Sequence, residues 1–238
     1  ILHDSIAEET FDIVLQRQGK ATRFRVGILR PNKPGLFPVV IKNDRFVFDL
    51  DEVQDTTVRK AYRISGRGDA EYNIAREAYA RGYVLCKFNR DEVAADNDTY
   101  RDTGVFTLYP EYDWGVIAAW AWIYSVVIDH LKTKAYIDGN RIVATGHSRG
   151  GKTALCAGIY EERIAVTAPN SSGTGGTGSW RYFDDEQRQQ WIRYHIDRHR
   201  HWWHANIYYF AGNEDRLPFD AHFHKALIAP RGLINPHS

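Results

Sequence analysis

The residues with the clearest chemical potential form the pentapeptide Gly146-His147-Ser148-Arg149-Gly150. It lies between a predicted strand over 141–145 and a predicted helix over 152–161. A G-x-S-x-G sequence in this position is typical of a nucleophile elbow, a strained turn that exposes the serine hydroxyl above the end of a strand. The pattern predicts Ser148 as the nucleophile of an acyl transfer. The backbone N–H of Arg149 would be one oxyanion donor.

Two cations stand beside this serine. Arg149 follows it directly, and Lys152 comes one helical turn later. A cation in this place can stabilise a tetrahedral intermediate or hold an anionic group of a substrate. The alternative is a pair of solvated charges at the start of a helix, and the spacing alone does not decide between the two.

The elements that must position this turn alternate between strands and helices. The pattern predicts an antiparallel hairpin over 11–29 with its turn at 16–20. Further predicted strands are 38–42, 82–88, 141–145, 164–168 and 232–234, predicted helices are 71–81, 113–131 and 152–161, with Asp113 as an N-cap, and 137–140 is a predicted turn. Such alternation predicts an α/β fold with a mostly parallel central sheet and helices on both faces, a three-layer αβα sandwich.

Composition excludes some classes of protein and leaves others open. The chain has 238 residues, 43% of them hydrophobic, which is enough for one sizeable α/β core. A net charge of +1 gives no indication of a nucleic acid or an anionic membrane as partner. Cys86 and Cys156 lie in apolar runs and are predicted to be buried thiols, with a disulfide left open. Seven Trp and fourteen Tyr favour either core filling or stacking on sugar rings.

From about residue 110 the chain resembles a known family, the carbohydrate esterase family 15 glucuronoyl esterases. The segments that carry the resemblance are 113–122, 141–143, 146–155, 215–222 and 226–231. The resemblance implies an α/β-hydrolase fold and cleavage of esters between 4-O-methyl-glucuronic acid on xylan and alcohols of lignin. It implies no cofactor and no metal, a polysaccharide or glucuronate ester as substrate, and a secreted or periplasmic location.

The resemblance also implies roles for individual residues. Ser148 would be the nucleophile, Arg149 would stabilise the oxyanion, and Lys152 would bind hydroxyls of the glucuronoyl ring. Segment 180–204 is inserted between sheet elements, where insertions of α/β folds build clefts. Its Trp, Arg and Glu residues suit a charged sugar, so Glu186 and Trp202 are predicted to bind substrate, with a packing helix as the alternative.

Two departures from the family concern the rest of a catalytic triad. Many members carry a Glu where this chain has Ser171. Other members place the acid on the loop after the strand at 232–234, and the family's catalytic His lies beyond Ser238. Neither triad partner is therefore assignable within the chain. We expect residues 1–238 to form a single α/β-hydrolase domain that is incomplete at its C-terminus.

Histidines within the chain offer no clear substitute. His195 and His199 have the i,i+4 spacing of a helical metal pair, but the HExxH pattern is missing. A polar helix over the cleft is the favoured interpretation, and no metal site is predicted. By resemblance, His222 is a structural or cleft-lining residue.

The sequence thus predicts a serine carboxylester hydrolase, a 4-O-methyl-glucuronoyl methylesterase. Two alternatives remain open. One is an acetyl-xylan type of carbohydrate esterase on the same fold. The other is a hydrolase-like protein of impaired activity that only binds polysaccharide. No nucleic acid or membrane partner is expected. A monomer is the expectation, although the sequence does not fix the oligomeric state.

Overall fold

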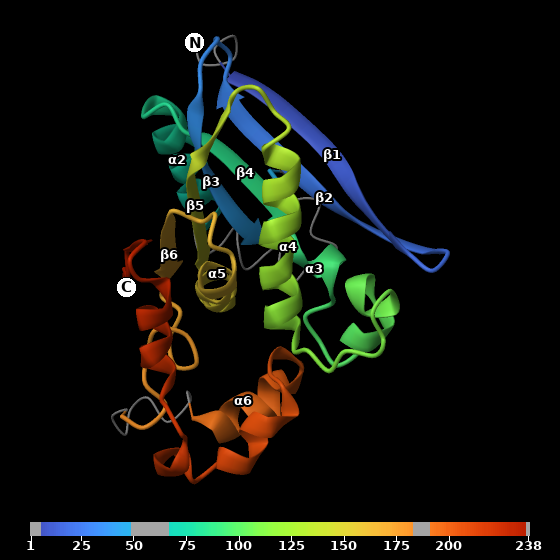
Figure 1. Ribbon diagram of the computed structural model, residues 1–238, viewed down its shortest axis with the longest axis vertical. Coiled ribbons are helices and arrows are strands. Elements are labelled where there is room, and N and C mark those ends of the chain that lie inside the picture. The colour runs from blue at the N-terminus through green and yellow to red at the C-terminus, as the bar shows by residue number, and fades with distance from the viewer. Residues whose placement is uncertain (1–5, 49–66, 183–190, 237–238) are drawn as a thin grey trace.

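Seven β-strands form one sheet in the residues that the computed structural model describes, which are 6–48, 67–182 and 191–236 (Figure 1). The strands are β1 (Ile6–Arg17), β2 (Lys20–Pro31), β3 (Phe37–Asp44), β4 (Val84–Asn89), β5 (Ile137–His147), β6 (Val166–Asn170) and β7 (Gly232–Leu233). The α-helices are α2 (Arg67–Ala80), α3 (Arg90–Val93), α4 (Val116–Leu131), α5 (Arg149–Tyr160) and α6 (Ile192–His199). Short 3-10 helices lie at Tyr100–Asp102, Gly104–Thr107, Arg200–Trp202, Ala205–Phe210, Glu214–Arg216 and Ala221–Ile228.

The order of the strands brings the ends of several of them to one edge. Along the sheet the order is β1-β2-β4-β3-β5-β6-β7. The pairs β1–β2 and β2–β4 are antiparallel, and the remaining pairs are parallel. Parallel neighbours end at the same edge, which is where open α/β sheets bind ligands. There His147 of β5 is in register with Asn170 of β6, so the residues that follow the two strands lie side by side.

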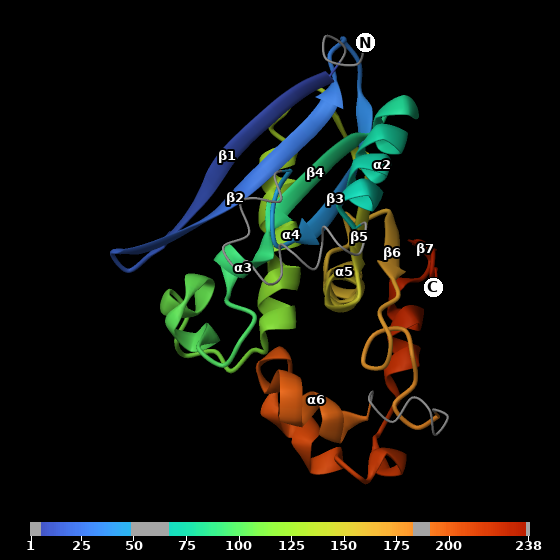
Figure 2. The same ribbon diagram turned by 180° about the vertical axis from the view of Figure 1, so that it is seen from behind.

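Helices cover both faces of the sheet. α2 lies on one face and α4 on the other, where α5 packs beside α4 (Figures 1 and 2). The mostly parallel sheet with helices on both faces is therefore confirmed. That residues 1–238 form a single domain, incomplete at its C-terminus, stays a prediction.

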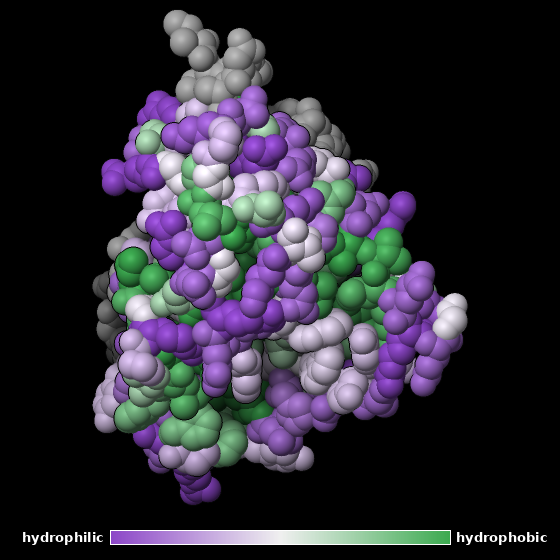
Figure 3. All heavy atoms as spheres, turned by 45° about the horizontal axis from the view of Figure 1, so that its top comes forward, coloured by the Kyte–Doolittle hydropathy of each residue, from purple (hydrophilic) through white to green (hydrophobic). Residues whose placement is uncertain are grey.

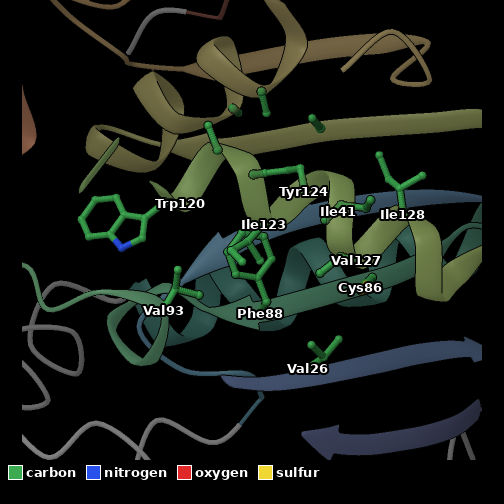
Figure 4. Close-up of a cluster of buried hydrophobic side chains, with 14 of the residues drawn as sticks. Val26, Ile41, Cys86, Phe88, Val93, Trp120, Ile123, Tyr124, Val127 and Ile128 are labelled. Atoms are coloured by element: carbon green, nitrogen blue, oxygen red, sulfur yellow. The ribbon is translucent and has the colours of Figure 1, made fainter. Parts of the chain in front are cut away.

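The core lies between α4 and the central strands. α4 is apolar on almost every side, and Trp120, Ile123 and Tyr124 are fully buried. Figure 4 shows these side chains beside Ile41 of β3 and Phe88 of β4. The rings of Phe88 and Tyr124 meet edge to face, with centroids 5.2 Å apart. Burial of each large apolar side chain contributes roughly 1.5–3 kcal/mol, so α4 is a firm support for β3 and β5.

The predicted start of the helix after Asp113 is wrong. α4 begins at Val116, and its N-cap is Gly115, which has no side-chain capping bond. A Cβ on Gly115 would come within 2.1 Å of the carbonyl oxygen of Trp202. The approach of a distant segment thus determines the start of this helix. Asp113 is exposed and pairs instead with His204 at 2.7 Å.

The predicted turn at 137–140 is also wrong, because these residues belong to β5. Ile137 is buried and pairs with Phe37, and the register then shifts before Val39 pairs with Ile142. Asp138 accepts a hydrogen bond from the backbone N–H of Asn140. A turn-like irregularity is therefore built into the strand and does not precede it.

The hairpin at the start of the chain is confirmed. β1 and β2 pair from Ile6↔Pro31 to Arg17↔Lys20, and Gln18 and Gly19 have positive φ angles in the turn. The face of the molecule in Figure 3 is mostly hydrophilic, with hydrophobic residues interspersed. None of the described helices is long and apolar enough to cross a membrane. Cys86 and Cys156 are free, and burial raises the pKa of both thiols, that of Cys156 to about 12.

Candidate active site

Ser148 occupies a strained turn between β5 and α5. Its φ of 55° and ψ of −118° lie outside the regions that a serine readily adopts. Its backbone N–H donates to the carbonyl of Asn170 at 3.0 Å, and its own carbonyl accepts from the N–H of Lys152 at 3.0 Å. The side chain is exposed. The turn therefore presents the hydroxyl at the edge of the sheet where β5 ends.

The glycines of the elbow are required by close approaches of backbone. A Cβ on Gly146 would lie 2.3 Å from the carbonyl oxygen of Gly150. A Cβ on Gly151 would lie 2.6 Å from the carbonyl oxygen of Asn170. Both distances are far below a normal contact, so strand and helix pack this tightly only without side chains at these positions.

A buried pair of side chains joins the two arms of the elbow. The amide of Asn43, at the end of β3, donates to the carbonyl of Gly150 at 3.0 Å and to the hydroxyl of Tyr124 at 2.7 Å. The Tyr124 hydroxyl in turn donates to the carbonyl of Thr145 at 2.7 Å. We call Asn43 and Tyr124 the elbow brace, because together they bind the end of β5 and the first turn of α5.

Arg149 is held beside the nucleophile by a buried carboxylate. Its guanidinium donates to Asp96, and its Cζ lies 4.9 Å from the centroid of the Trp202 ring. His201 Nε2 and Trp202 Nε1 also donate to Asp96 Oδ1, at 3.0 and 2.8 Å. Trp202 is thus buried under the arginine, where it supports Arg149, and its predicted role in substrate binding stays a prediction.

Sequence reasoning missed Asp96. Its side chain is only 1% exposed, although it lies in a polar, irregular segment after β4. Burial alone would raise the pKa of Asp96, but hydrogen bonds from His201 and Trp202 and the charge of Arg149 lower it well below its usual range. The signal that could have pointed to it is a carboxylate shortly after β4, a strand that ends at the same edge as β5.

Lys152 is almost fully buried in the first turn of α5. Its Nζ donates to the backbone carbonyl of Ser172, in the loop after β6. Burial and the nearby charge of Arg149 lower the pKa of Lys152 to about 7. A lysine that changes charge near neutral pH lies next to the nucleophile, and its contact with sugar hydroxyls stays a prediction.

Histidines of α6 lie against the same tryptophans. His195 is buried between the rings of Trp180, Trp202 and Trp203, and His199 stacks on Trp202 with centroids 3.9 Å apart. Burial, together with neighbouring positive charge, lowers the pKa of His195 to about 3 and that of His199 to about 4. Both rings are therefore neutral near pH 7. The described residues contain no group of three or more His, Cys, Asp or Glu that is arranged to hold a metal ion.

Within the described residues, no partner that would complete a triad is hydrogen-bonded to Ser148. In the ranges that the structure describes, no side chain hydrogen-bonds to its hydroxyl. Ser171 follows β6 beside the nucleophile, with a φ of 45°, and its hydroxyl donates to Asn170 Oδ1. Glu186, predicted to bind substrate, lies outside the described residues.

His222 lies beside a buried acid of another loop. Its Nδ1 is 3.6 Å from Asp220, whose carboxylate accepts from the backbone N–H groups of Trp180, Arg181 and Ala221. Asp220 thereby fixes the loop that leads into the inserted segment. The cleft-lining role of His222 stays a prediction.

Comparison with known proteins gives sequence relatives over most of the chain. The sequence model of the family described as glucuronyl esterase, fungi, matches residues 66–237. A 4-O-methyl-glucuronoyl methylesterase of Hypocrea jecorina is 39% identical over 161 residues, which cover 64% of this chain and 35% of that protein. One of Podospora anserina is 31% identical over 239 residues, 96% of this chain and 44% of that protein. The chain therefore spans less than half the length of these relatives.

Solved structures share the fold. A CE15 glucuronoyl esterase from Teredinibacter turnerae has a TM-score of 0.80 at 24% identity, covering 97% of this chain and 56% of that one. The glucuronoyl esterase catalytic domain from Hypocrea jecorina has a TM-score of 0.71 at 29% identity, covering 98% and 60%. A glucuronoyl esterase from Sporotrichum thermophile, solved in complex with methyl 4-O-methyl-beta-D-glucopyranuronate, has a TM-score of 0.71 at 26% identity, covering 98% and 59%. These likenesses confirm the predicted α/β-hydrolase fold.

Proposed function

This chain belongs to the glucuronyl esterase family, and we propose that it acts as a serine carboxylester hydrolase on 4-O-methyl-glucuronate esters of a plant or algal polysaccharide. The observation that carries this proposal is the geometry of Ser148. Its hydroxyl is exposed on a strained turn, at the shared edge of the parallel strands and at the start of α5. The names of the relatives indicate which ester is cleaved, and the elbow provides the nucleophile.

The proposed reaction follows acyl transfer through a serine. The Ser148 oxygen attacks the carbonyl carbon of the uronate ester, and the charge that develops on the carbonyl oxygen is stabilised by the backbone N–H of Arg149. The guanidinium of Arg149, fixed by Asp96, adds positive charge beside the same oxygen. A general base of the full-length protein would take the proton of the Ser148 hydroxyl and give it to the departing alcohol. The resulting acyl-enzyme is hydrolysed by water, which releases the free uronate and restores the serine hydroxyl.

The residues proposed to bind the sugar are Lys152, Glu186 and Trp202. Lys152 lies within one helical turn of the nucleophile and holds a donor that titrates near pH 7. Trp202 sets the position of the Arg149 guanidinium through their stacked contact. Glu186 is proposed on the resemblance and on its place in the inserted segment.

The direct test replaces the nucleophile in the full-length protein. Ser148→Ala should reduce hydrolysis of benzyl glucuronate by at least about a thousandfold, because loss of a catalytic nucleophile removes covalent catalysis. Thr133→Ala, which removes an exposed hydroxyl at the end of α4, is the matched control and should keep full activity. Unchanged hydrolysis by Ser148→Ala would show that the serine is not the nucleophile.

A second candidate function is a polysaccharide-binding protein of impaired activity. It is favoured by Ser171, which stands where many family members carry the catalytic Glu, and by the Ser148 hydroxyl, to which no described side chain hydrogen-bonds. Full-length protein that binds glucuronoxylan but hydrolyses neither benzyl glucuronate nor acetylated xylan would support this function. Hydrolysis of acetyl esters alone would support the acetyl-xylan type of esterase.

Location and assembly are proposals that rest on the family. A secreted or periplasmic protein would meet polysaccharide outside the cell, and a monomer is proposed. Fractionation of the source cells and light scattering of the purified full-length protein would test the two points.

A further inference from the structure

A polar pocket of about 790 Å³ lies beside the candidate active site and is separate from it. Its walls come from two segments, 98–113 before α4 and 196–208 at the end of α6 and beyond. Ser148, Arg149 and Lys152 are not among the lining residues. The pocket is therefore a second concave surface, and the proposed reaction does not use it.

Three arginines line this pocket without a carboxylate partner. Arg101, Arg198 and Arg200 each place the guanidinium over a tyrosine ring. The distance from the guanidinium carbon to the ring centroid is 5.1 Å for Arg101, 5.0 Å for Arg198 and 5.9 Å for Arg200. Within the described part of the chain, none of the three forms an ion pair with Asp or Glu. A guanidinium can bind a carboxylate through two parallel N–H···O hydrogen bonds, which the ammonium group of a lysine cannot form.

The other walls of the pocket offer acceptors and flat apolar surfaces. Asp98 and Asp113 are highly exposed, with 88% and 78% of their side chains accessible, so a hydroxyl donor can reach their carboxylates. Each lies near one histidine, Asp98 at 3.5 Å from His201 and Asp113 at 2.7 Å from His204. Aromatic rings among the lining residues offer faces that suit the C–H side of a sugar.

We propose that this pocket binds an acidic sugar unit, a hexuronate. Its carboxylate would lie at the guanidiniums of Arg198 and Arg200, and its hydroxyls would donate to the aspartates. A neutral sugar would leave the arginines without a carboxylate. A phosphate dianion would meet stronger repulsion than a singly charged carboxylate from the acidic residues of the same pocket, Asp98, Asp113 and Asp197. A ligand that combines one carboxylate with several hydroxyls matches both sets of groups.

The pocket is also connected to the nucleophile side. His201 lines the pocket, and its Nε2 donates to Asp96, which holds the guanidinium of Arg149. An occupied pocket therefore lies two contacts from the arginine of the active site. That the hexuronate is a neighbouring unit of the polysaccharide being cleaved rests on the proposed function, whereas binding itself does not.

The test measures binding of free sugars to the full-length protein by nitrogen-15 NMR, with the Trp203 indole signal as the local reporter. Glucuronate should shift this signal, and glucose at equal concentration should not. Arg198→Gln/Arg200→Gln should weaken glucuronate binding by at least about tenfold, because the charge-assisted hydrogen bonds of two guanidiniums to the carboxylate would be lost. Neither guanidinium makes an ion pair that folding would lose.

Controls separate the loss of these two arginines from a general loss of positive charge and from the chemistry at Ser148. Arg23→Gln/Arg81→Gln removes two exposed arginines elsewhere and should leave the affinity unchanged. Ser148→Ala should also bind glucuronate normally at Trp203, whether or not the protein is an esterase. If the double variant has a lowered Tm, each single arginine variant replaces it. Equal shifts by glucose and glucuronate, or an affinity unchanged by loss of both arginines, would overturn the proposal.

Discussion

The elbow and the inserted segment around α6 are built in different ways. At the elbow, polar side chains are matched to backbone groups at 2.7 to 3.0 Å, as in the contacts of the elbow brace with Thr145 and Gly150. Around α6, aromatic rings make the contacts, and neither ring nitrogen of the buried His195 has a hydrogen-bond partner among the described residues. At the elbow, hydrogen bonds fix the positions of individual atoms, whereas the segment around α6 is held by the packing of its rings.

This difference suits the two tasks that the proposed function requires. A nucleophile must be held in one strained conformation, because a small misplacement costs a large part of the rate. A surface that receives a sugar benefits from flat rings and from polar groups that can change partners. Asp96 joins the regions, since it contacts Arg149 at the start of α5 and Trp202 after α6.

The largest effect is expected from a side chain inside the elbow. Gly146→Ala would place a Cβ 2.3 Å from the Gly150 carbonyl oxygen, so strand and helix must separate. We expect a loss of about 3 kcal/mol in the free energy of unfolding and no esterase activity. Gly139→Ala, where the nearest atom is 3.6 Å away, is the control and should be nearly neutral. Urea denaturation of both variants makes the comparison, and equal stability would show that the elbow tolerates more than its packing implies.

The next effect concerns the carboxylate that joins the two regions. Asp96→Asn leaves Arg149 without its charged partner, and we expect about 3 kcal/mol lower stability at pH 7 and much weaker ester hydrolysis. Because the pKa of Asp96 is depressed in the folded state, its stabilisation is present above pH 4 and is lost as the pH falls below that value. The difference between wild type and Asp96→Asn should therefore shrink on acidification.

An exposed ion pair serves as the control for Asp96. Asp129→Asn removes a carboxylate that is 69% exposed and bound to Arg163, and it should change stability by less than about 1 kcal/mol. Thermal unfolding of both variants at pH 7 and pH 3 decides the point. A constant difference for Asp96→Asn across this range would contradict the assigned charge.

A smaller effect is expected from the elbow brace. Tyr124→Phe removes the hydroxyl that donates to Thr145 and accepts from Asn43, while the ring stays in the core. We expect a loss of about 1–2 kcal/mol in stability and a lower kcat with little change in KM. Tyr160→Phe, at a tyrosine that is 82% exposed, should show neither change. If KM changed by as large a factor as kcat, the elbow brace would not act by positioning the nucleophile.

The last prediction concerns the slope of the unfolding free energy against pH. The pKa of Lys152 is about 7 in the folded protein, far below its unfolded value, because of burial and Arg149. Between pH 7 and 10 the unfolded chain binds the extra proton, so stability rises with pH by up to about 1.4 kcal/mol per unit. Lys152→Met should remove this contribution, and Lys33→Met at an exposed lysine should retain it. The slope of the unfolding free energy against pH measures both.

Local patterns were sufficient to predict the elbow and most elements of the fold. The G-x-S-x-G turn depends on residues adjacent in sequence, and a strand and a helix flank Ser148 as the pattern predicts, although β5 begins earlier, at Ile137, and α5 begins earlier, at Arg149. The hairpin and the mostly parallel character of the sheet follow from equally local signals, whereas the order of its strands does not. Arg149 and Lys152 could be singled out because they directly follow the nucleophile.

Contacts between distant residues account for what could not be predicted. Asp96 acquires its role only when segments 96 and 201–202 meet, and Asn43 only when β3 lies beside α5. The start of α4 shifts from Asp113 because the Trp202 carbonyl needs room at Gly115. The position of Asp96 shortly after β4 is a local signal, but no local spacing indicates which distant side chains these residues contact.

The hairpin at the start of the chain leaves a long strand border open to a neighbour. In the described part of the chain β1 is the first strand of the sheet, and its outer N–H and C=O groups run along one side of the molecule (Figure 1). A border of this kind recruits strands from other copies unless charge disfavours it. Charged side chains follow this ribbon, among them Glu8, Glu9, which pairs with Arg30, and Asp12, which pairs with Arg23, and they would have to lose water before a second strand could pair with it. Replacing these acids with threonine would allow the β1 strands of two molecules to pair, and the protein would aggregate in concentrated solution.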